Sequence, residues 1–343
     1  MKAARGALLL VAALAASAAP GSASRFISEQ ADARTPAPWR ALDDRERDHF
    51  DLGHAVLNTG WTPAGQPAGR RDGLGPHFNA ASCDACHNSR RRGRGPEGDG
   101  PAPADLAMQV GRLGADGRVV RGYPPFGDVI NLAAVPDTVP EAEISIRYEL
   151  QVRRRPDGSQ LVLRQPLYKV KPSGNPTLPA DLVLMPRMSP QVQGIGLLER
   201  VPEAAITATG GDGGPRLGEP SWLETPTGRQ LGRYGWQASQ PTLEAQVAAA
   251  LAHEMGLGTR LLPADGAGDA AEVEVDDELF DAVVAFQRWE AARRPPEAAR
   301  RLQAAAAGWR LFEQAGCADC HRPALPVRDG GFIAAWTDLR LHD

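Results

Sequence analysis

The chain has 343 residues, of which 23% are charged, and its formal net charge is −4. This length is enough for two domains with cores of their own. A net negative charge gives no overall basic field, so composition argues against nucleic acid as a partner.

The first segment is typical of an export signal. Lys2 and Arg5 precede an apolar run over residues 7–19, and small residues follow it. The run is too short for an ordinary spanning helix, so we expect cleavage near Ala23 or Ser24 and a periplasmic mature protein. An uncleaved anchor is the alternative. No later stretch reaches the ~18 apolar residues of a membrane span, so none is expected in the mature chain.

The first half of the mature chain mixes helix, turns and strands. Amphipathic spacing predicts a helix over 43–58, and several Gly-containing turns follow it. Residues 106–172 are rich in strand formers. Alternation over 144–152, the turn Pro156-Asp157-Gly158 and a return over 161–170 predict a β-hairpin. Residues 173–235 are loop-rich, with a short helix expected near Glu203.

Helices dominate the second half. A helix is expected over 243–255, with Thr242 as its cap and Gly256 at its end. A second is expected over 276–293, stopped by Pro295-Pro296, and a third over 297–314.

All four cysteines lie in two copies of one motif. These are Cys83-Asp84-Ala85-Cys86-His87 and Cys317-Ala318-Asp319-Cys320-His321. Two intervening residues bring the two thiols to the separation of the vinyl groups of one porphyrin, and the following His reaches its iron. Two disulfides, or one zinc ion shared by the four cysteines, are the alternatives. In an exported chain with no other cysteine, the pattern predicts two covalently bound haem c groups.

His87 and His321 are the expected proximal ligands of the two irons. The sixth position decides between a closed electron-transfer site and an open one that binds peroxide. Its candidates are Met185, Met188, Met255, Met108, His77, His253 and His342. Each of these is also a plausible packing residue or surface histidine.

Residues 88–105 are rich in Arg, Gly and Pro and are expected to form an exposed loop. Four arginines lie in it: Arg90, Arg91, Arg92 and Arg94. They are expected to form a solvated face. The alternative is contact with haem propionates or with an acidic electron-transfer partner.

Several segments resemble the dihaem oxidoreductase branch, also called "thiol oxidoreductase", of the bacterial dihaem cytochrome c peroxidase superfamily. The resemblance covers nearly the whole mature chain. Its segments are Asp72-Gly73-Leu74-Gly75-Pro76-His77-Phe78-Asn79, Gly194-Ile195-Gly196-Leu197-Leu198-Glu199, Tyr234-Gly235-Trp236-Gln237-Ala238, Pro241-Thr242-Leu243 with Gln246, Glu254-Met255-Gly256, Trp336-Thr337-Asp338-Leu339 and Leu341-His342-Asp343.

The resemblance implies a catalytic role for three residues. Trp236 matches the family's tryptophan between the haems, and Gln246 and Glu254 match residues above the peroxide-binding iron. Eight residues, or about two helical turns, separate Gln246 from Glu254, so they share a helix face. Glu254 suits the base that moves a proton between peroxide oxygens. A solvated Glu254 and a core Trp236 are the alternatives.

The chain departs from the family's pattern in two places. Leu182 stands where the family has a distal histidine, so Met185 or Met188 is a candidate replacement. The chain also ends 22 residues after His321, at Asp343. A cytochrome c domain usually continues further, so we expect a truncated second haem domain.

The predicted fold class is mainly α: two cytochrome c-type haem domains with a loop-rich, hairpin-containing insertion between them. The expected segments are a signal peptide (1–24), a first haem domain (25–110), a loop and β-rich region (111–235), a helical region with the candidate active site (236–295) and a second, truncated cytochrome c domain (296–343).

The expected function is that of a periplasmic dihaem cytochrome, an oxidoreductase of peroxidase type. Its expected partners are a small redox protein or other electron donor and a small oxidant such as peroxide. A purely electron-transferring cytochrome with two six-coordinate irons is one alternative. A haem-containing binding protein without its catalytic half is another.

Overall fold

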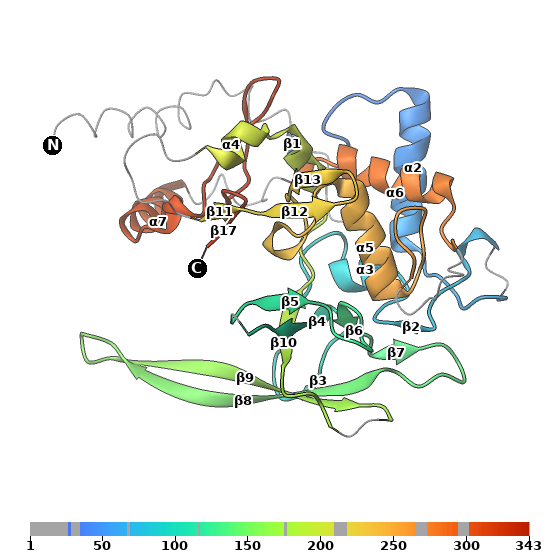
Figure 1. The fold of residues 1–343 in the computed structure, drawn as a ribbon. Coiled ribbons are helices and arrows are strands. Elements are labelled where there is room, and N and C mark those ends of the chain that lie inside the picture. The colour runs from blue at the N-terminus through green and yellow to red at the C-terminus, as the bar shows by residue number, and fades with distance from the viewer. Residues whose placement is uncertain are drawn as a thin grey trace. The chain divides into compact units, whose positions relative to one another are not determined.

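We describe a computed structural model of the chain, drawn in Figure 1. It describes residues 27–28, 35–66, 69–115, 117–174, 177–208, 218–264, 273–293 and 302–342. The expected export signal over residues 1–24 lies outside these ranges. Within them, every helix is too short or too polar to cross a bilayer.

The chain divides into two compact units, and each is discontinuous in sequence. Unit 1 is formed by residues 1–50, 193–246 and 284–343, and unit 2 by residues 51–192 and 247–283. Unit 2 contains the motif at Cys83–His87, and unit 1 contains the motif at Cys317–His321.

The core of unit 2 is built on a sheet centred on β4 (Leu106–Leu113). Antiparallel partners of β4 are β10 (Leu182–Met188), β5 (Val119–Arg121) and β6 (Val129–Ile130). Alternate residues of β4 point inward, as expected of a strand with one buried face. The buried cluster on that face comprises Met108, Val110, Tyr123, Phe126, Ile130, Ala142 and Ile144.

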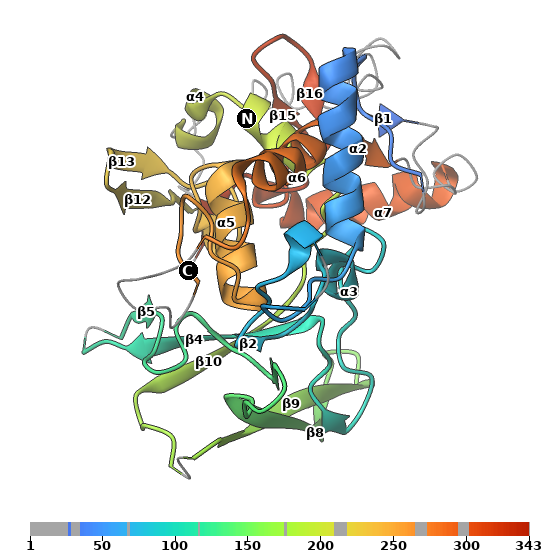
Figure 2. The same ribbon diagram turned by 90° about the vertical axis from the view of Figure 1, so that its right-hand side faces the viewer.

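A long hairpin extends from the same unit. β8 (Ala142–Arg154) and β9 (Gln160–Pro172) pair along their full lengths, and β3 (Gly100–Pro101) pairs with β8. The predicted hairpin is therefore confirmed, and Figures 1 and 2 show its two strands side by side. Its inner half is buried at Ile144 and Ile146. Its outer half exposes aliphatic side chains, with Leu150 69% and Val152 59% exposed.

The helices follow their end signals in the sequence. They are α2 (Asp44–Asn58), α3 (Cys83–His87), α4 (Glu203–Thr207), α5 (Leu243–Met255), α6 (Asp277–Trp289) and α7 (Leu302–Gln314). The predicted bounds of α5 are confirmed. Thr242 Oγ1 accepts a hydrogen bond from Ala245 N at 3.1 Å, and Gly256 has a φ of 63°. The short helix expected near Glu203 is also confirmed.

The helix expected over 276–293 ends earlier, at Trp289. Residues 292–293 instead form β14 (Ala292–Arg293), which pairs in parallel with β1 (Ile27–Ser28). The helix expected over 297–314 is described from Leu302 onward, and its first five residues lie outside the described ranges.

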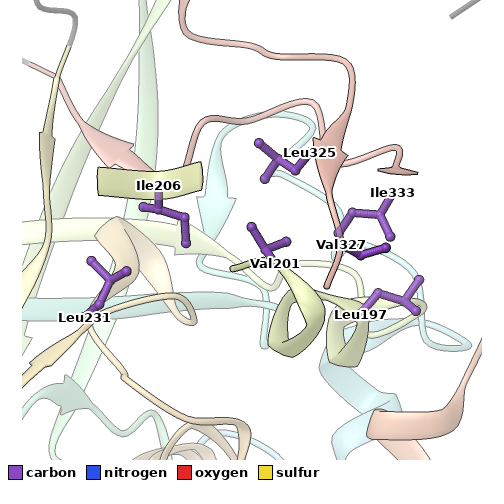
Figure 3. Close-up of a cluster of buried hydrophobic side chains, with 7 residues drawn as sticks. All are labelled: Leu197, Val201, Ile206, Leu231, Leu325, Val327 and Ile333. Atoms are coloured by element: carbon purple, nitrogen blue, oxygen red, sulfur yellow. The ribbon is translucent and has the colours of Figure 1, made fainter. Parts of the chain in front are cut away.

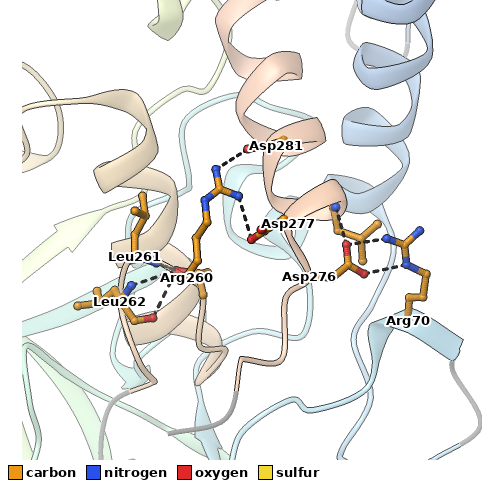
Figure 4. A network of polar contacts seen from close by, with 9 residues as sticks. Arg70, Arg260, Leu261, Leu262, Asp276, Asp277 and Asp281 are labelled. Atoms are coloured by element: carbon orange, nitrogen blue, oxygen red, sulfur yellow. Dashed lines mark hydrogen bonds and ion pairs between the residues drawn. The ribbon is translucent and has the colours of Figure 1, made fainter.

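A polar network fixes the start of α6 (Figure 4). Asp276 Oδ1 accepts a hydrogen bond from Leu279 N at 2.9 Å, which caps the helix, and Asp276 also forms an ion pair with Arg70 at 2.6 Å. The guanidinium of Arg260 contacts two carboxylates that lie one turn apart in α6, Asp277 at 3.1 Å and Asp281 at 2.6 Å.

Unit 1 is held by a small apolar core and several two-stranded sheets. The sheets pair β11 (Glu219–Pro220) with β17 (Arg340–Leu341), β12 (Trp222–Thr225) with β13 (Gly228–Leu231), and β15 (Leu325–Pro326) with β16 (Phe332–Ile333). The core cluster in Figure 3 comprises Leu197, Val201, Ile206, Leu231, Leu325, Val327 and Ile333. The short 3-10 helices of unit 1 are η3 (Ile195–Arg200), η4 (Trp236–Ala238) and η5 (Cys317–Asp319). The remaining short elements belong to unit 2 and are η2 (Gly69–Arg71), β2 (His77–Phe78) and β7 (Ala133–Ala134).

The predicted fold class, mainly α, is wrong. Helix and strand each make up about 27% of the described residues, and the strands form several small sheets. The error has a physical cause. β4 pairs with β10 across about seventy residues of sequence (Arg112 with Leu182), and many other strands have two residues. Neither feature produces a periodic pattern in the sequence.

Candidate haem-attachment sites

The first motif forms the short helix α3 in unit 2. Ser82 caps it by accepting a hydrogen bond from Ala85 N at 3.3 Å. Cys83 is half-buried, Cys86 is buried, and both thiols are free of disulfide. Burial raises the pKa of Cys83 to about 11. Burial, followed by the charge of Glu254, raises the pKa of Cys86 to about 12.

The ring of His87 is oriented by a backbone carbonyl from a distant part of the chain. Its Nδ1 lies 2.6 Å from the Pro190 carbonyl oxygen. A carbonyl only accepts hydrogen bonds, so Nδ1 carries the proton and Nε2 carries the lone pair that a metal ion binds. Burial lowers the pKa of His87, which favours the neutral form required of a ligand.

The turn after His87 is tightly fixed. Asn88, Ser89 and Arg90 have positive φ values of 42°, 59° and 65° in succession, an uncommon run for non-glycine residues. Ser89 N donates to Asp84 Oδ1 at 2.6 Å, and Val192 N donates to the Arg90 carbonyl at 3.0 Å. These contacts hold the segment at 190–192 against the motif.

The solvated face expected for the arginine-rich loop is present in part. Arg91, Arg92 and Arg94 are exposed. For Arg90 the expectation is wrong, because its side chain is 1% exposed, with Nη1 3.4 Å from His54 Nε2. The left-handed run turns the chain back after His87, and this places Arg90 inside unit 2.

Glu254 belongs to the surroundings of this first motif. Asn79 Nδ2 donates to Glu254 Oε2 at 3.0 Å, and Asn79 N donates to the Glu254 backbone carbonyl at 2.8 Å. Asn79 Oδ1 in turn accepts from Leu132 N at 3.0 Å, so its amide orientation is defined. The carboxylate is therefore positioned, and it is near enough to Cys86 to raise that thiol's pKa.

The second motif lies in unit 1, after α7. Its histidine repeats the arrangement of the first, with His321 Nδ1 3.2 Å from the Trp336 carbonyl oxygen. Trp336, which supplies this carbonyl, has a φ of 54°. A positive φ is unfavourable for tryptophan, so the backbone is strained at the residue that contacts the imidazole. Nε2 of His321 again carries the lone pair.

Aromatic rings gather around His321. Trp309 stacks on Phe312 at 5.8 Å between centroids, and Trp336 meets Phe312 edge-on at 6.0 Å. Phe312 lies 6.2 Å from the His321 ring. Although apolar, Trp336 is 51% and Leu311 is 65% exposed. This surface suits a flat apolar group such as a porphyrin.

His342, a candidate sixth ligand, is occupied at both ring nitrogens. Nδ1 lies 3.5 Å from Cys320 Sγ, and Nε2 lies 3.0 Å from Asp338 Oδ2. The ring of His342 therefore contacts Cys320 on one side and Asp338 on the other. No role was predicted for Asp338.

Gln246 lies beside Gly235, the residue before Trp236, in unit 1. Trp236 is 36% exposed, so the core alternative for this residue is wrong. Gly235, with a φ of 72°, leaves room for Gln246: an added Cβ there would lie 2.7 Å from Gln246 Oε1. Gln246 and Glu254 lie in the same helix, α5, which has its first turn in unit 1 and the rest in unit 2, and Trp236 lies in unit 1.

The three methionines predicted as distal ligands all lie in or next to regular elements. Met185 and Met188 are half-buried residues of β10, and Met255, at the end of α5, is 3% exposed. Met188 is two residues from Pro190, whose carbonyl oxygen lies 2.6 Å from His87 Nδ1. Their ligation remains a prediction.

The donor sets fit haem c. All four cysteines are free of disulfide. Across the residues that the structure describes, no group of three or more His, Cys, Asp or Glu side chains could hold a metal ion. Each motif instead presents two thiols and one imidazole with a defined Nε2 lone pair. No role was predicted for Pro190, Trp336, Asn79 and Asp338, although the last three lie in segments that carry the family resemblance. The carbonyl partners left no signal in the sequence, because any residue type supplies a carbonyl.

No family model, curated protein or solved structure matches the chain.

Proposed function

We propose that the chain is an exported dihaem c-type cytochrome that acts as an oxidoreductase of peroxidase type. One observation carries the proposal: in both C-x-x-C-H motifs, histidine Nδ1 meets a backbone carbonyl, at 2.6 Å for His87 and 3.2 Å for His321. Metal-bound histidines almost always donate their second ring N–H to a carbonyl or carboxylate. A disulfide would not require this orientation of the following residue.

In this proposal the four cysteines form thioethers with two haems, and His87 and His321 bind the irons. When bound, the haems supply irons that exchange electrons. The overall reaction consumes hydrogen peroxide, two electrons and two protons and gives two water molecules. A small periplasmic redox protein is the proposed electron donor.

The protein's part in peroxide cleavage is to move a proton from one oxygen to the other. We assign this step to Glu254 for two reasons. Asn79 donates a hydrogen bond to its carboxylate, and its charge is close enough to the first motif to raise the pKa of Cys86. Gln246, two turns before Glu254 in α5, is proposed as a further polar residue of the reaction, and Trp236 is proposed as an electron relay.

The test is expression of the full chain with its export signal, in cells that attach haem to exported proteins. Mass spectrometry would give the number of haems per chain, and the ferric spectrum would give the spin state. Two haems, one of them high-spin, together with peroxide turnover are expected. Two low-spin haems without turnover would replace the peroxidase with an electron-transfer cytochrome. A chain that carries no haem would overturn the proposal.

A further inference from the structure

Cys320, His342 and Asp338 form a linked row in unit 1. Cys320 Sγ is 3.5 Å from His342 Nδ1, and His342 Nε2 is 3.1 Å and 3.0 Å from the two oxygens of Asp338. A thiol, an imidazole and a carboxylate in this order form the arrangement in which a base activates a cysteine and a third group orients the base.

Asp338 sets which nitrogen of His342 carries the proton. An ionised carboxylate only accepts hydrogen bonds, so the proton lies on Nε2 and the lone pair on Nδ1, facing the sulfur. Asp338 is 5% exposed, and its Oδ1 also accepts from Arg340 N at 3.0 Å. Asp338 is therefore held in place by the backbone, and it fixes the orientation of the His342 imidazole.

The short strand before His342 is anchored at several points. β17 pairs with β11, and the Arg340 guanidinium donates from Nε to the Ile206 carbonyl at 2.8 Å and from Nη2 to the Ala208 carbonyl. Gly218, with a φ of 72°, faces the ring: an added Cβ would lie 2.6 Å from His342 Cε1. Only glycine leaves room for the imidazole here.

We propose that His342, oriented by Asp338, is the base that assists thioether formation between Cys320 and a haem vinyl group. The inference rests on the proposed function, because it presupposes haem at the second motif. Its substrate is an iron porphyrin that bears vinyl groups.

The proposed step balances without any oxidant or reductant. His342 Nδ1 takes the proton as the Cys320 S–H bond breaks, and the sulfur bonds to the vinyl carbon attached to the porphyrin ring. The C=C bond becomes a single bond, and the outer vinyl carbon takes a proton, which returns from His342 or comes from water. The product is a thioether in which one carbon joins the sulfur to the ring and bears a methyl group, and no electrons are gained or lost.

The first motif provides an internal reference. There Cys86 Sγ donates to the Ala104 carbonyl at 3.3 Å, and a carbonyl does not take up the proton. A defect in the proposed base should therefore affect attachment at the second motif and leave the first unchanged.

The experiment compares His342→Ala and Asp338→Asn with the wild-type full chain, exported in haem-attaching cells. Cys320→Ala gives the reference for a haem held by one bond, and His49→Ala is the control histidine variant. Peptide mass spectrometry would count the bonds at each motif, and the reduced pyridine adduct would report vinyl groups that remain unreacted.

In His342→Ala we expect the rate of bond formation at Cys320 to fall about 100-fold, within the range of general-base effects. Chains with a single thioether at Cys317 should then accumulate, and the first motif should be complete. Asp338→Asn should show a smaller defect of the same kind. If His342→Ala misfolds and also loses the haem of the first motif, the Asp338→Asn variant tests the role of His342 instead.

Two failures are distinguishable. A wild-type chain without haem at the second motif would remove the proposed function and this inference with it. A wild-type chain with two haems, together with His342→Ala and Asp338→Asn chains that form both thioethers at the wild-type rate, would overturn only the role of His342.

Discussion

The side-chain carboxylate of Glu254 accepts a hydrogen bond from Asn79, four residues before the first cysteine. Replacing it with the isosteric amide keeps the shape and removes the proton acceptor. In Glu254→Gln we expect peroxide turnover to fall by about 100-fold or more, with the haem count unchanged. Steady-state peroxide consumption measures the turnover, and Glu203→Gln, at an exposed position, is the control. Full turnover in Glu254→Gln would remove this carboxylate from the mechanism.

Gly218 allows a second test at the same scale. Its positive φ and the 2.6 Å approach to His342 Cε1 mean that a methyl group would displace the imidazole. Gly218→Ala should reproduce the attachment defect of His342→Ala, as read by peptide mass spectrometry. Gly228→Ala is the matched control, because it also has a positive φ, 109°, but an added Cβ there meets no atom within 4 Å. A normal second thioether in Gly218→Ala would show that the ring tolerates the displacement.

At the scale of elements, the start of α6 combines a cap with an ion pair. The hydrogen bond from Arg70 lowers the pKa of Asp276. A carboxylate with a lowered folded pKa stabilises the fold above its ordinary pKa, and this stability is lost as the pH falls through the folded value. Both partners are about half exposed, so solvent screens the ion pair and its contribution to stability is small.

Chemical unfolding between pH 2 and pH 6 measures this contribution. Arg70→Gln should flatten the acid limb of the unfolding free energy. Asp276→Ala should cost about 1 kcal/mol more than Arg70→Gln near neutral pH, since it also removes the cap on Leu279. Equal losses in the two variants would mean that the cap contributes nothing.

The sequence predicts elements well where the signal is local. Both ends of α5 follow from the residues next to it, Thr242 and Gly256. The β8–β9 hairpin follows from the turn residues that directly join its two strands. Pairing between β4 and β10, and the meeting of His87 with Pro190 across 103 positions, depend on tertiary structure. The cysteines and histidines of the motifs could be named from the sequence, but the groups that orient them could not.

At the scale of the whole molecule, each motif and the carbonyl that orients its histidine lie within one unit. His87 and Pro190 are in unit 2, and His321 and Trp336 are in unit 1. Haem attachment at the two motifs should therefore be separable. A Cys83→Ser/Cys86→Ser double variant should carry one haem, at the second motif. Whole-chain mass spectrometry checks this, with Cys317→Ser/Cys320→Ser as the reciprocal variant. Loss of both haems in either variant would contradict it.

The long hairpin affects how the protein behaves in concentrated solution. Its outer half exposes Leu150, Val152 and Val162, and β9 is an edge strand among the described strands. Such a ribbon invites pairing with another copy, yet the hairpin over 142–172 has an excess of positive charge: against the acidic Glu143, Glu149 and Asp157 it carries Arg147, Arg153, Arg154, Arg155, Arg164, Lys169 and Lys171. These cations act as gatekeepers against fibrillation. Because salt screens them, light scattering of concentrated samples should rise with ionic strength, and purification should favour dilute, low-salt buffers.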